Sequence, residues 1–362
     1  MNNIKIPVVK PQLPPKDEYT KLIDKIWEKN ILTNQGPYLR ELEDKIKQSQ
    51  QLKYFQMVTN GTIAIQFALR ALDLPQNSEI ITTPFSYVAT LTSIIWENFK
   101  PVFVDISPDD FNIDASQIES KITENTRAIL AVHVFGNPCD VYALNKIAEK
   151  YNLNIIYDAA HAFGCKLDGK SLLEYGDIST VSFHATKVFH TVEGGGVVTS
   201  NKELFRKIDL LKKFGHEGDT HLCPGINGKC SEIHAAMGLA LLPHLPEIIS
   251  KRKQKTLLYD SLLKDKFVRP KWKFSTFEPN YAYYPIVLSS EQECLKTKER
   301  LEKSGIGARR YFYPSLNTLP YITRAEEFEI SQRISKRILC LPLYPELRDD
   351  DIKYISELIL QK

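Results

Sequence analysis

The stretch SFHATKVFHTVEGGG, residues 182–196, combines a single lysine with three consecutive glycines, and the apolar pair Val197-Val198 follows it. The lysine, Lys187, lies five residues after Ser182 and 29 residues after Asp158. A lone lysine is usually a solvated surface charge, so its meaning depends on the segments around it. Those segments alternate between short apolar runs and longer amphipathic runs.

The alternation predicts the fold class. The apolar runs are typical of strands, at 54–58, 79–82, 101–104, 127–132, 154–157, 178–182 and 196–200. The amphipathic runs predict helices at 62–72, 87–97, 114–121, 140–150 and 201–213. This order favours an α/β fold with a mostly parallel, doubly wound sheet that helices cover on both faces. Because such sheets bind ligands outside the carboxyl ends of their strands, the loops there should carry the chemistry.

Two helices are expected before this alternation. The first is Asp17–Lys29, and the second carries Leu39, Leu42 and Ile46 on one face. A turn that contains Gly36 separates them.

Beyond the alternation, a helical stretch from Ser231 to Leu263 contains Pro243 and Pro246, which should kink or break it. A strand at 281–288 and helices at 291–304 and 349–361 follow. We therefore expect two domains, a large one at 1–248 that includes the N-terminal segment and a smaller C-terminal α+β domain at 249–362.

Composition narrows the class of protein. The 362 residues include 47 basic and 44 acidic ones, a net charge of +3 with no basic block, so nucleic-acid binding is not expected. We expect no membrane span, because no apolar run approaches the ~18 residues that a span needs. Prolines stand where a signal peptide would be apolar. The six cysteines and eight histidines form no ligand set, which predicts reduced thiols, no metal and a cytoplasmic protein.

Three segments follow predicted strands and carry polar or aromatic groups. Asn60-Gly61-Thr62 would let backbone N–H groups approach a phosphate at a helix N-terminus, although a plain helix cap looks the same. Tyr87 could stack on a planar ligand or pack in the core. Asp158 could balance the charge of a pyridinium or cap the next helix.

Five segments in this order resemble the DegT/DnrJ/EryC1/StrS family of nucleotide-sugar aminotransferases. They are TTPFSYVAT (82–90), YDAAH (157–161), SFHATK (182–187), EGG (193–195) and GINGKCSEIHAA (225–236), together with the Gly61-Thr62 pair. Lys229 stands where the family often has arginine. The resemblance implies fold type I of the pyridoxal-phosphate-dependent transferases and a transamination reaction.

The resemblance also implies residue roles. Lys187 would bond covalently to pyridoxal 5′-phosphate and move the proton, with pyridoxamine 5′-phosphate as the intermediate form. The other cofactor contacts would be the phosphate (Gly61, Thr62, Ser182), the ring nitrogen (Asp158), the two ring faces (Tyr87, Ala160) and the phenolic oxygen (His161). Asn227 would reach the phosphate in the partner subunit of a homodimer with shared active sites.

The implied substrates are an amino-acid donor, L-glutamate, and a nucleotide-linked keto-deoxyhexose. His161 and Glu193 resemble members that aminate C-4, which would give dTDP-4-amino-4,6-dideoxyglucose for surface polysaccharide such as O-antigen. Amination at C-3 and a non-catalytic cofactor-binding regulator stay as alternatives, whereas Lys187 disfavours a dehydratase. Gly36, Arg310 and Tyr313 are candidate substrate contacts, and Arg309 with Arg310 could hold a diphosphate or a carboxylate, or form a solvated face.

Overall fold

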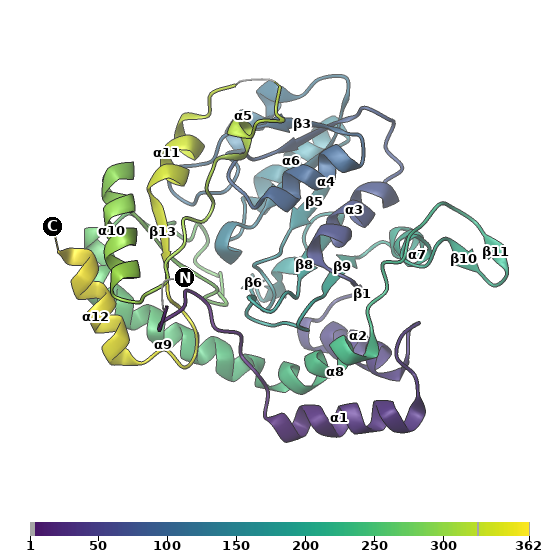
Figure 1. Cartoon of the computed structure of the whole chain (residues 1–362). Coiled ribbons are helices and arrows are strands. Elements are labelled where there is room, and N and C mark those ends of the chain that lie inside the picture. Colours follow the sequence, from purple (N-terminus) through teal and green to yellow (C-terminus); the bar gives the residue numbers. More distant parts are fainter. Residues whose placement is uncertain (1–3, 324–325, 362) are drawn as a thin grey trace.

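The computed structural model describes residues 4–323 and 326–361, so residues 1–3 and 362 of the two predicted domains lie outside the described residues. Its centre is a seven-stranded sheet in the order β1-β9-β8-β5-β4-β2-β3 (Figure 1). The strands are β1 (Tyr54–Val58), β2 (Glu79–Thr82), β3 (Lys100–Phe103), β4 (Thr126–Val132), β5 (Asn154–Asp158), β8 (Ile178–Ser182) and β9 (Gly195–Thr199). Each lies within one residue of its predicted range.

The sheet is mostly parallel, as predicted, with one exception. Strand β9 runs antiparallel to both of its neighbours, β1 and β8. Two reversals restore the direction, so β1, β8, β5, β4, β2 and β3 all have their carboxyl ends at the same edge. The sequence pattern predicts the strand at 196–200 but holds no signal for its direction.

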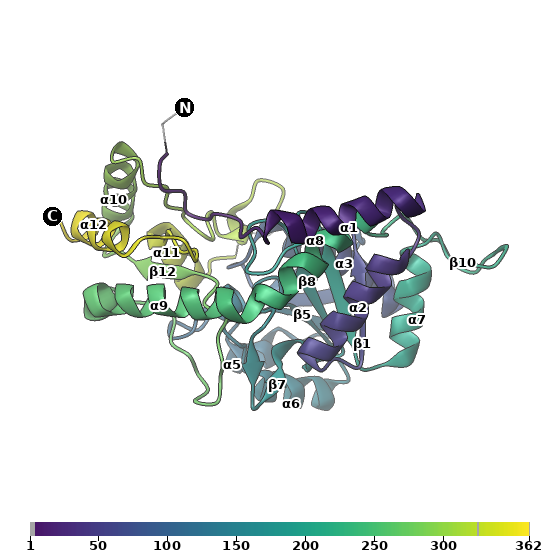
Figure 2. The ribbon, with the colours of Figure 1, turned by 90° about the horizontal axis from the view of Figure 1, so that it is seen from below.

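Helices cover both faces because strand side chains alternate between them. On one face, Val58, Leu130 and Ile156 pack against α3 (Gly61–Ala71), α4 (Val88–Trp96) and α7 (Lys202–Leu211). On the other, Met57 and Ile155 pack against α2 (Pro37–Gln50), α6 (Val141–Tyr151) and α8 (Glu232–Leu241). The doubly wound architecture is therefore confirmed. Helix α1 (Lys16–Lys29) lies along α8 (Figure 2).

A second, separate core forms the C-terminal part. It lies around the antiparallel pair β12 (Tyr284–Val287) and β13 (Ile338–Leu341), with α10 (Glu291–Lys303), α11 (Glu329–Arg337) and α12 (Asp349–Leu360). Helix α9 (Leu245–Leu263) joins the parts, since Ile248 packs in the first core and Tyr259 in the second (Figure 2). A boundary near residue 248 thus stays a proposal, and it falls inside a continuous helix.

Several elements differ from the expectation. The first described residues pair with the C-terminal part, where Ile6 bridges Ile306, rather than with the large domain. The prolines break the long helix as predicted, through the 3₁₀ turn Leu242–His244 between α8 and α9. The helix expected at 114–121 is present as the single turn α5 (Ala115–Ile118), which the 3₁₀ turn Glu119–Lys121 continues. The sequence pattern missed α11, β13 and two short hairpins, β6 (Lys166–Leu167) with β7 (Lys170–Ser171) and β10 (His216–Glu217) with β11 (Thr220–His221).

The stretch from Glu232 to Lys266 corrects one expectation about membranes. It contains an 18-residue window that is long and apolar enough, by composition alone, to cross a bilayer. However, 56% of that window is buried inside the protein. Because α8 packs against α1 and α2, its apolar side chains are those of a core helix.

Candidate active site

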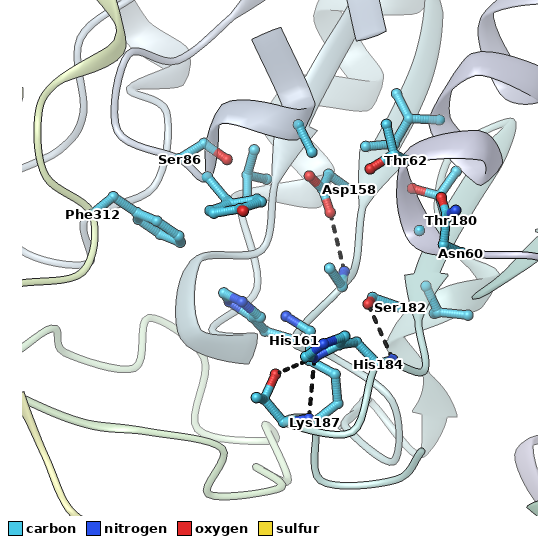
Figure 3. A pocket seen from close by; sticks show the side chains of 18 of the residues that line it. Asn60, Thr62, Ser86, Asp158, His161, Thr180, Ser182, His184, Lys187 and Phe312 are labelled. Atoms are coloured by element: carbon cyan, nitrogen blue, oxygen red, sulfur yellow. Dashed lines mark hydrogen bonds between the residues drawn. The ribbon is translucent and has the colours of Figure 1, made fainter. Parts of the chain in front are cut away.

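The carboxyl edge of the sheet carries a cavity of about 350 Å³ (Figure 3). Loops that follow β1, β2, β5 and β8 line it, together with Glu193, which precedes β9, and residues 309–312 of the C-terminal part. Asp158 lies on one side of this pocket, and Lys187 with His184 lies on the other. Parallel strands bring their carboxyl ends together, which is why residues as distant in sequence as Asn60, Asp158 and Lys187 meet here.

One end of the cavity is suited to a phosphate. Helix α3 begins at Gly61, and the side chain of Asn60 accepts the Ile63 N–H at 2.9 Å. The first N–H groups of a helix lack intrahelical partners and attract anions. A Cβ on Gly61 would lie 2.9 Å from Cβ of Ser182, so only glycine lets the helix approach the Ser182 hydroxyl this closely.

Gly195 allows a second close approach at the same end. A Cβ there would lie 2.4 Å from the carbonyl carbon of Asn60. The glycine turn of the 182–196 stretch therefore lets β9 enter the sheet directly beside the start of α3.

Asp158 supplies the buried carboxylate. Its Oδ2 accepts a hydrogen bond from the Thr90 hydroxyl at 2.7 Å, and its Oδ1 accepts one from the Ala160 N–H at 3.1 Å. Burial raises the pKa of this carboxyl group, whereas the two hydrogen bonds and the nearby Lys187 oppose the rise. Bonds to the charged form make the site suitable for a cationic ring nitrogen.

Lys187 supplies the amine. Burial lowers its pKa to about 8, Asp158 acts in the opposite direction, and the positive charge of Arg309 lowers the pKa further. A lysine normally titrates near 10.4, so at neutral pH a much larger share of this amine is free to attack an aldehyde or accept a proton.

Aromatic side chains flank these groups. Tyr87 is 49% exposed, which leaves its ring available for stacking on a planar group. His161 is buried, and its ring is nearly parallel to that of Phe312 at 5.8 Å between centroids. Burial lowers the pKa of His161 well below its usual value, and the charge of Lys187 acts in the same direction. His161 is therefore a neutral hydrogen-bonding group.

Eight of the predicted residues meet at this cavity, namely Gly61, Thr62, Tyr87, Asp158, Ala160, His161, Ser182 and Lys187. Four others do not line it: Gly36, Asn227, Arg310 and Tyr313. Arg310 instead pairs with Glu291 at 2.6 Å, and its guanidinium stacks on Tyr313 at 3.5 Å. Arg310 and Tyr313 therefore interact within the C-terminal part, where the Arg310 side chain is 11% exposed and Tyr313 is 47% exposed.

Arg309 takes the place in the cavity that Arg310 was expected to have. The backbone at Arg309 pairs with Cys340 of β13, and neighbouring side chains of such an extended segment point to opposite faces. One of two adjacent arginines therefore had to face the cavity, and the sequence did not show which. In the described part of the chain no ion pair engages Arg309.

Gly36 and Asn227 lie in loops that adjoin each other. Glu232, at the start of α8, accepts the N–H groups of Tyr38 and Leu39 at 2.8 and 2.9 Å. A Cβ on Gly36 would lie 2.4 Å from the Glu232 carboxyl carbon. Asn227 is exposed at the base of an arm, residues 213–228, that projects from the body at β10 and β11 (Figure 1).

Sequence reasoning missed several residues at or behind the cavity. Ser86 and Thr90 lie within the TTPFSYVAT segment, four residues apart across the start of α4, and this spacing could have linked them to each other. Glu193 lines the cavity and was used only to choose the sugar position. No signal in the sequence separates Arg309 from Arg310.

The geometry defines a class of enzyme with a reactive lysine, a buried carboxylate and an anion-binding helix end around one cavity. A model of the DegT/DnrJ/EryC1/StrS aminotransferase family matches residues 15–360, and the chain belongs to this family. It is a sugar aminotransferase. The chain is 41% identical, over 97% of both sequences, to dTDP-4-amino-4,6-dideoxy-D-glucose transaminase of Shigella dysenteriae. It is 32% identical to GDP-perosamine synthase of Escherichia coli O157:H7, over 98% of this chain and 97% of that one.

Solved structures agree in fold. DesI in the presence of its TDP-sugar product matches with a TM-score of 0.91 at 30% identity, over 98% of this chain and 92% of that one. A putative sugar aminotransferase, Spr1654 from Streptococcus pneumoniae, was solved in its PMP form and matches with a TM-score of 0.92 at 25% identity, over 98% of both chains. The fold type I architecture is therefore confirmed.

Proposed function

We propose that this enzyme transfers an amino group from L-glutamate to C-4 of dTDP-4-keto-6-deoxyglucose, with pyridoxal 5′-phosphate as cofactor. The observation that carries the proposal is the convergence of Lys187, Asp158 and the N-terminus of α3 on one cavity. The choice of sugar rests on the 41% identity to a transaminase that is named for the corresponding product.

The residues present fit the cofactor. The cradle at Gly61, with Thr62 and the Ser182 hydroxyl, would hold its phosphate, and Asp158 would pair with its ring nitrogen. Tyr87 and Ala160 would contact the two faces of the ring, and His161 would lie near its phenolic oxygen. When bound, the group supplies an electron-accepting ring that stabilises negative charge on the substrate carbon.

Lys187 performs the proton transfers. Its amine is the basic group of the cavity with a pKa of about 8, so it accepts a proton from the donor's α-carbon and returns a proton during amination of the sugar. Asp158 keeps its negative charge beside the ring nitrogen throughout. Asp158 is only 6% exposed, so little water screens its charge and its interaction with the ring nitrogen would be strengthened.

Arg309 is the candidate anchor for the acidic substrates. Its guanidinium lines the cavity 4.6 Å from the Tyr311 ring. A planar guanidinium binds carboxylate or phosphate oxygens through paired hydrogen bonds, and both substrates bring such groups. This role replaces the one expected for Arg310.

We further propose a homodimer with shared active sites. Two observations support it: the projecting arm carries exposed Phe214, Leu222 and Ile226, and Asn227 lies at its base away from the cavity of its own chain. A two-fold dimer would place each arm against the other subunit, where Asn227 would reach the cofactor phosphate. The neighbouring turn at Gly36 would face the same partner site.

The amino sugar would serve cell-surface polysaccharide such as O-antigen, and the reaction would take place in the cytoplasm. Free thiols at all six cysteines are compatible with a reducing compartment.

An absorbance experiment tests the proposal. L-glutamate should convert the visible band of the lysine-bound cofactor to that of the pyridoxamine form, and dTDP-4-keto-6-deoxyglucose should then restore it. NMR of the product should place nitrogen on C-4. Nitrogen on C-3 would support the alternative regiochemistry, and a protein that binds cofactor but shows neither conversion would support a non-catalytic regulator.

The similarity to GDP-perosamine synthase makes a GDP-linked sugar the second candidate. The same assay with GDP-4-keto-6-deoxymannose distinguishes the two. A higher kcat/KM for the GDP sugar would overturn the choice of nucleotide and leave the aminotransferase reaction intact.

A further inference from the structure

Behind Asp158 lies a chain of two hydroxyl groups that the proposed reaction does not use directly. The Ser86 and Thr90 hydroxyl oxygens are 2.7 Å apart, and the Thr90 hydroxyl lies 2.7 Å from Oδ2 of Asp158. Ser86 is 2% exposed, Thr90 is 0% exposed, and Asp158 is 6% exposed. Ser86 lines the cavity, whereas Thr90 has no exposed surface, so bulk water does not hydrate the Thr90 hydroxyl.

The direction of the hydrogen bonds follows from the donor inventory. An ionised carboxylate only accepts hydrogen bonds, and a threonine hydroxyl has a single hydrogen to donate. Thr90 must donate that hydrogen to Asp158, so its oxygen accepts the hydrogen of Ser86. The order Ser86 to Thr90 to Asp158 is thus fixed while Asp158 is charged.

Such a chain of hydrogen bonds stabilises the charged form of a buried carboxylate. Hydrogen bonds to an ionised group are about twice as strong as neutral ones, and a second donor polarises the first. The Ala160 N–H is the other donor, on Oδ1. Removing the Thr90 hydroxyl would therefore leave one oxygen of a buried carboxylate without its donor, which favours the neutral acid.

The chain also depends on how the backbone folds locally. Ser86 lies in the turn after β2, and Thr90 lies in the first turn of α4, which begins at Val88. Residues that are four positions apart at the start of a helix lie on the same side of that helix. Both hydroxyl groups therefore lie on the side of α4 that faces Asp158 at the end of β5. Tyr87, the expected stacking residue, lies between them in sequence.

We propose that the Ser86–Thr90 pair is a positioning device, which acts through Asp158 to keep the ring nitrogen of the bound cofactor protonated. It thereby sets how well the ring accepts electrons. This inference rests on the proposed cofactor and adds two residues to the proposed mechanism.

The test uses holoenzyme loaded with cofactor that carries ¹⁵N at the ring nitrogen. Thr90→Val keeps the shape of the side chain and removes the hydroxyl, whereas Thr90→Ser restores the hydroxyl. Thr92→Val is the matched control, because Thr92 lies on the same helix and its hydroxyl donates to its own turn, at the Val88 carbonyl. The readouts are the ¹⁵N chemical shift at one pH, kcat and KM.

Wild type, Thr90→Ser and Thr92→Val should show the shift of a protonated ring nitrogen. Thr90→Val should move toward the shift of neutral pyridine, and its kcat should fall about tenfold with a smaller change in the KM for L-glutamate. A Thr90→Val enzyme with the wild-type ¹⁵N shift would overturn the inference.

A second variant covers the case in which Thr90→Val does not fold. Ser86→Ala removes only the outer donor and should move the ¹⁵N shift in the same direction by less, and an unchanged shift in this variant would also overturn the inference. Failure of the wild type to bind the cofactor would instead refute the proposed function, so the two failures are distinguishable.

Discussion

The loops at the carboxyl edge of the sheet and the projecting arm, residues 213–228, differ in how far their side chains are buried within the chain. At the sheet edge, Lys187, Asp158 and Ser182 line one cavity within a single chain, and burial is the main cause of the shifted pKa values of Lys187 and Asp158. On the arm, Phe214 and Ile226 are exposed, with ring and side chain about half accessible to solvent. The groups proposed for the reaction at the sheet edge therefore meet within one chain, whereas the role proposed for the arm requires a second subunit.

The largest effect is expected from removing the reactive amine at the sheet edge. Lys187→Ala should lower turnover by roughly 10³-fold or more, because the same amine holds the cofactor and moves the proton. Lys202→Ala, an exposed lysine on α7, is the control and should be unchanged. Steady-state kinetics and the visible absorbance band check both variants. A Lys187→Ala enzyme with wild-type turnover would refute the assignment.

The second effect tests the arm. Asn227→Ala should weaken cofactor binding at least about tenfold, because it removes a hydrogen bond to a charged phosphate. At a cofactor concentration too low to load Asn227→Ala, mixing this variant with inactive Lys187→Ala dimers should create hybrid dimers with one intact site. About a quarter of wild-type sites should be recovered if subunits exchange freely. Activity measured before and after exchange decides this. No recovery despite hybrids seen by mass spectrometry would mean that the sites are not shared.

The third effect separates two adjacent arginines. Arg309→Ala should raise the KM of an acidic substrate about tenfold and leave stability unchanged, because its guanidinium faces the cavity. Arg310→Ala should leave the KM unchanged and cost about 1 kcal/mol of unfolding free energy through the lost pair with Glu291. Kinetics and denaturant titration of both variants measure this. The reverse pattern would restore the original expectation for Arg310.

The smallest effect is a pH dependence. Only the neutral amine of Lys187 attacks the cofactor, and its pKa is about 8. Cofactor uptake by apoenzyme should therefore rise about fivefold from pH 7 to pH 8 and level off above. In Arg309→Ala the midpoint should move to higher pH, because the charge of Arg309 lowers the pKa of Lys187. Stopped-flow absorbance checks this, and a flat profile would contradict the low pKa.

The same contrast shows what the sequence can predict. All seven strands of the sheet were predicted because each is an apolar run between turn residues. The eight cavity residues were predicted because they lie in motifs that resemble those of the family, at or near the ends of strands or in the loops that follow them. The antiparallel direction of β9 was not predictable, because a strand buries the same apolar side chains whether its neighbours run parallel or antiparallel to it. Strand β13 was missed because its apolar run, Ile338–Leu341, has only four residues and shows no period.

The remaining site residues could not be predicted from the sequence because their roles depend on contacts between distant segments. Arg309 and Arg310 are equivalent in sequence, and only the pairing of Arg309 with Cys340 turns one of them to the cavity. Thr90 gains its role from a carboxylate 68 residues away. Gly36 and Asn227 remain predictions, because their proposed site belongs to another subunit.

The most direct measurement is to reduce the cofactor-loaded enzyme with borohydride, digest it and locate the modified lysine by mass spectrometry. The account predicts a phosphopyridoxyl group on Lys187 within the 182–196 stretch, with resistance to trypsin cleavage at that residue. Modification at another lysine, or no modification of an enzyme that has full activity, would contradict it.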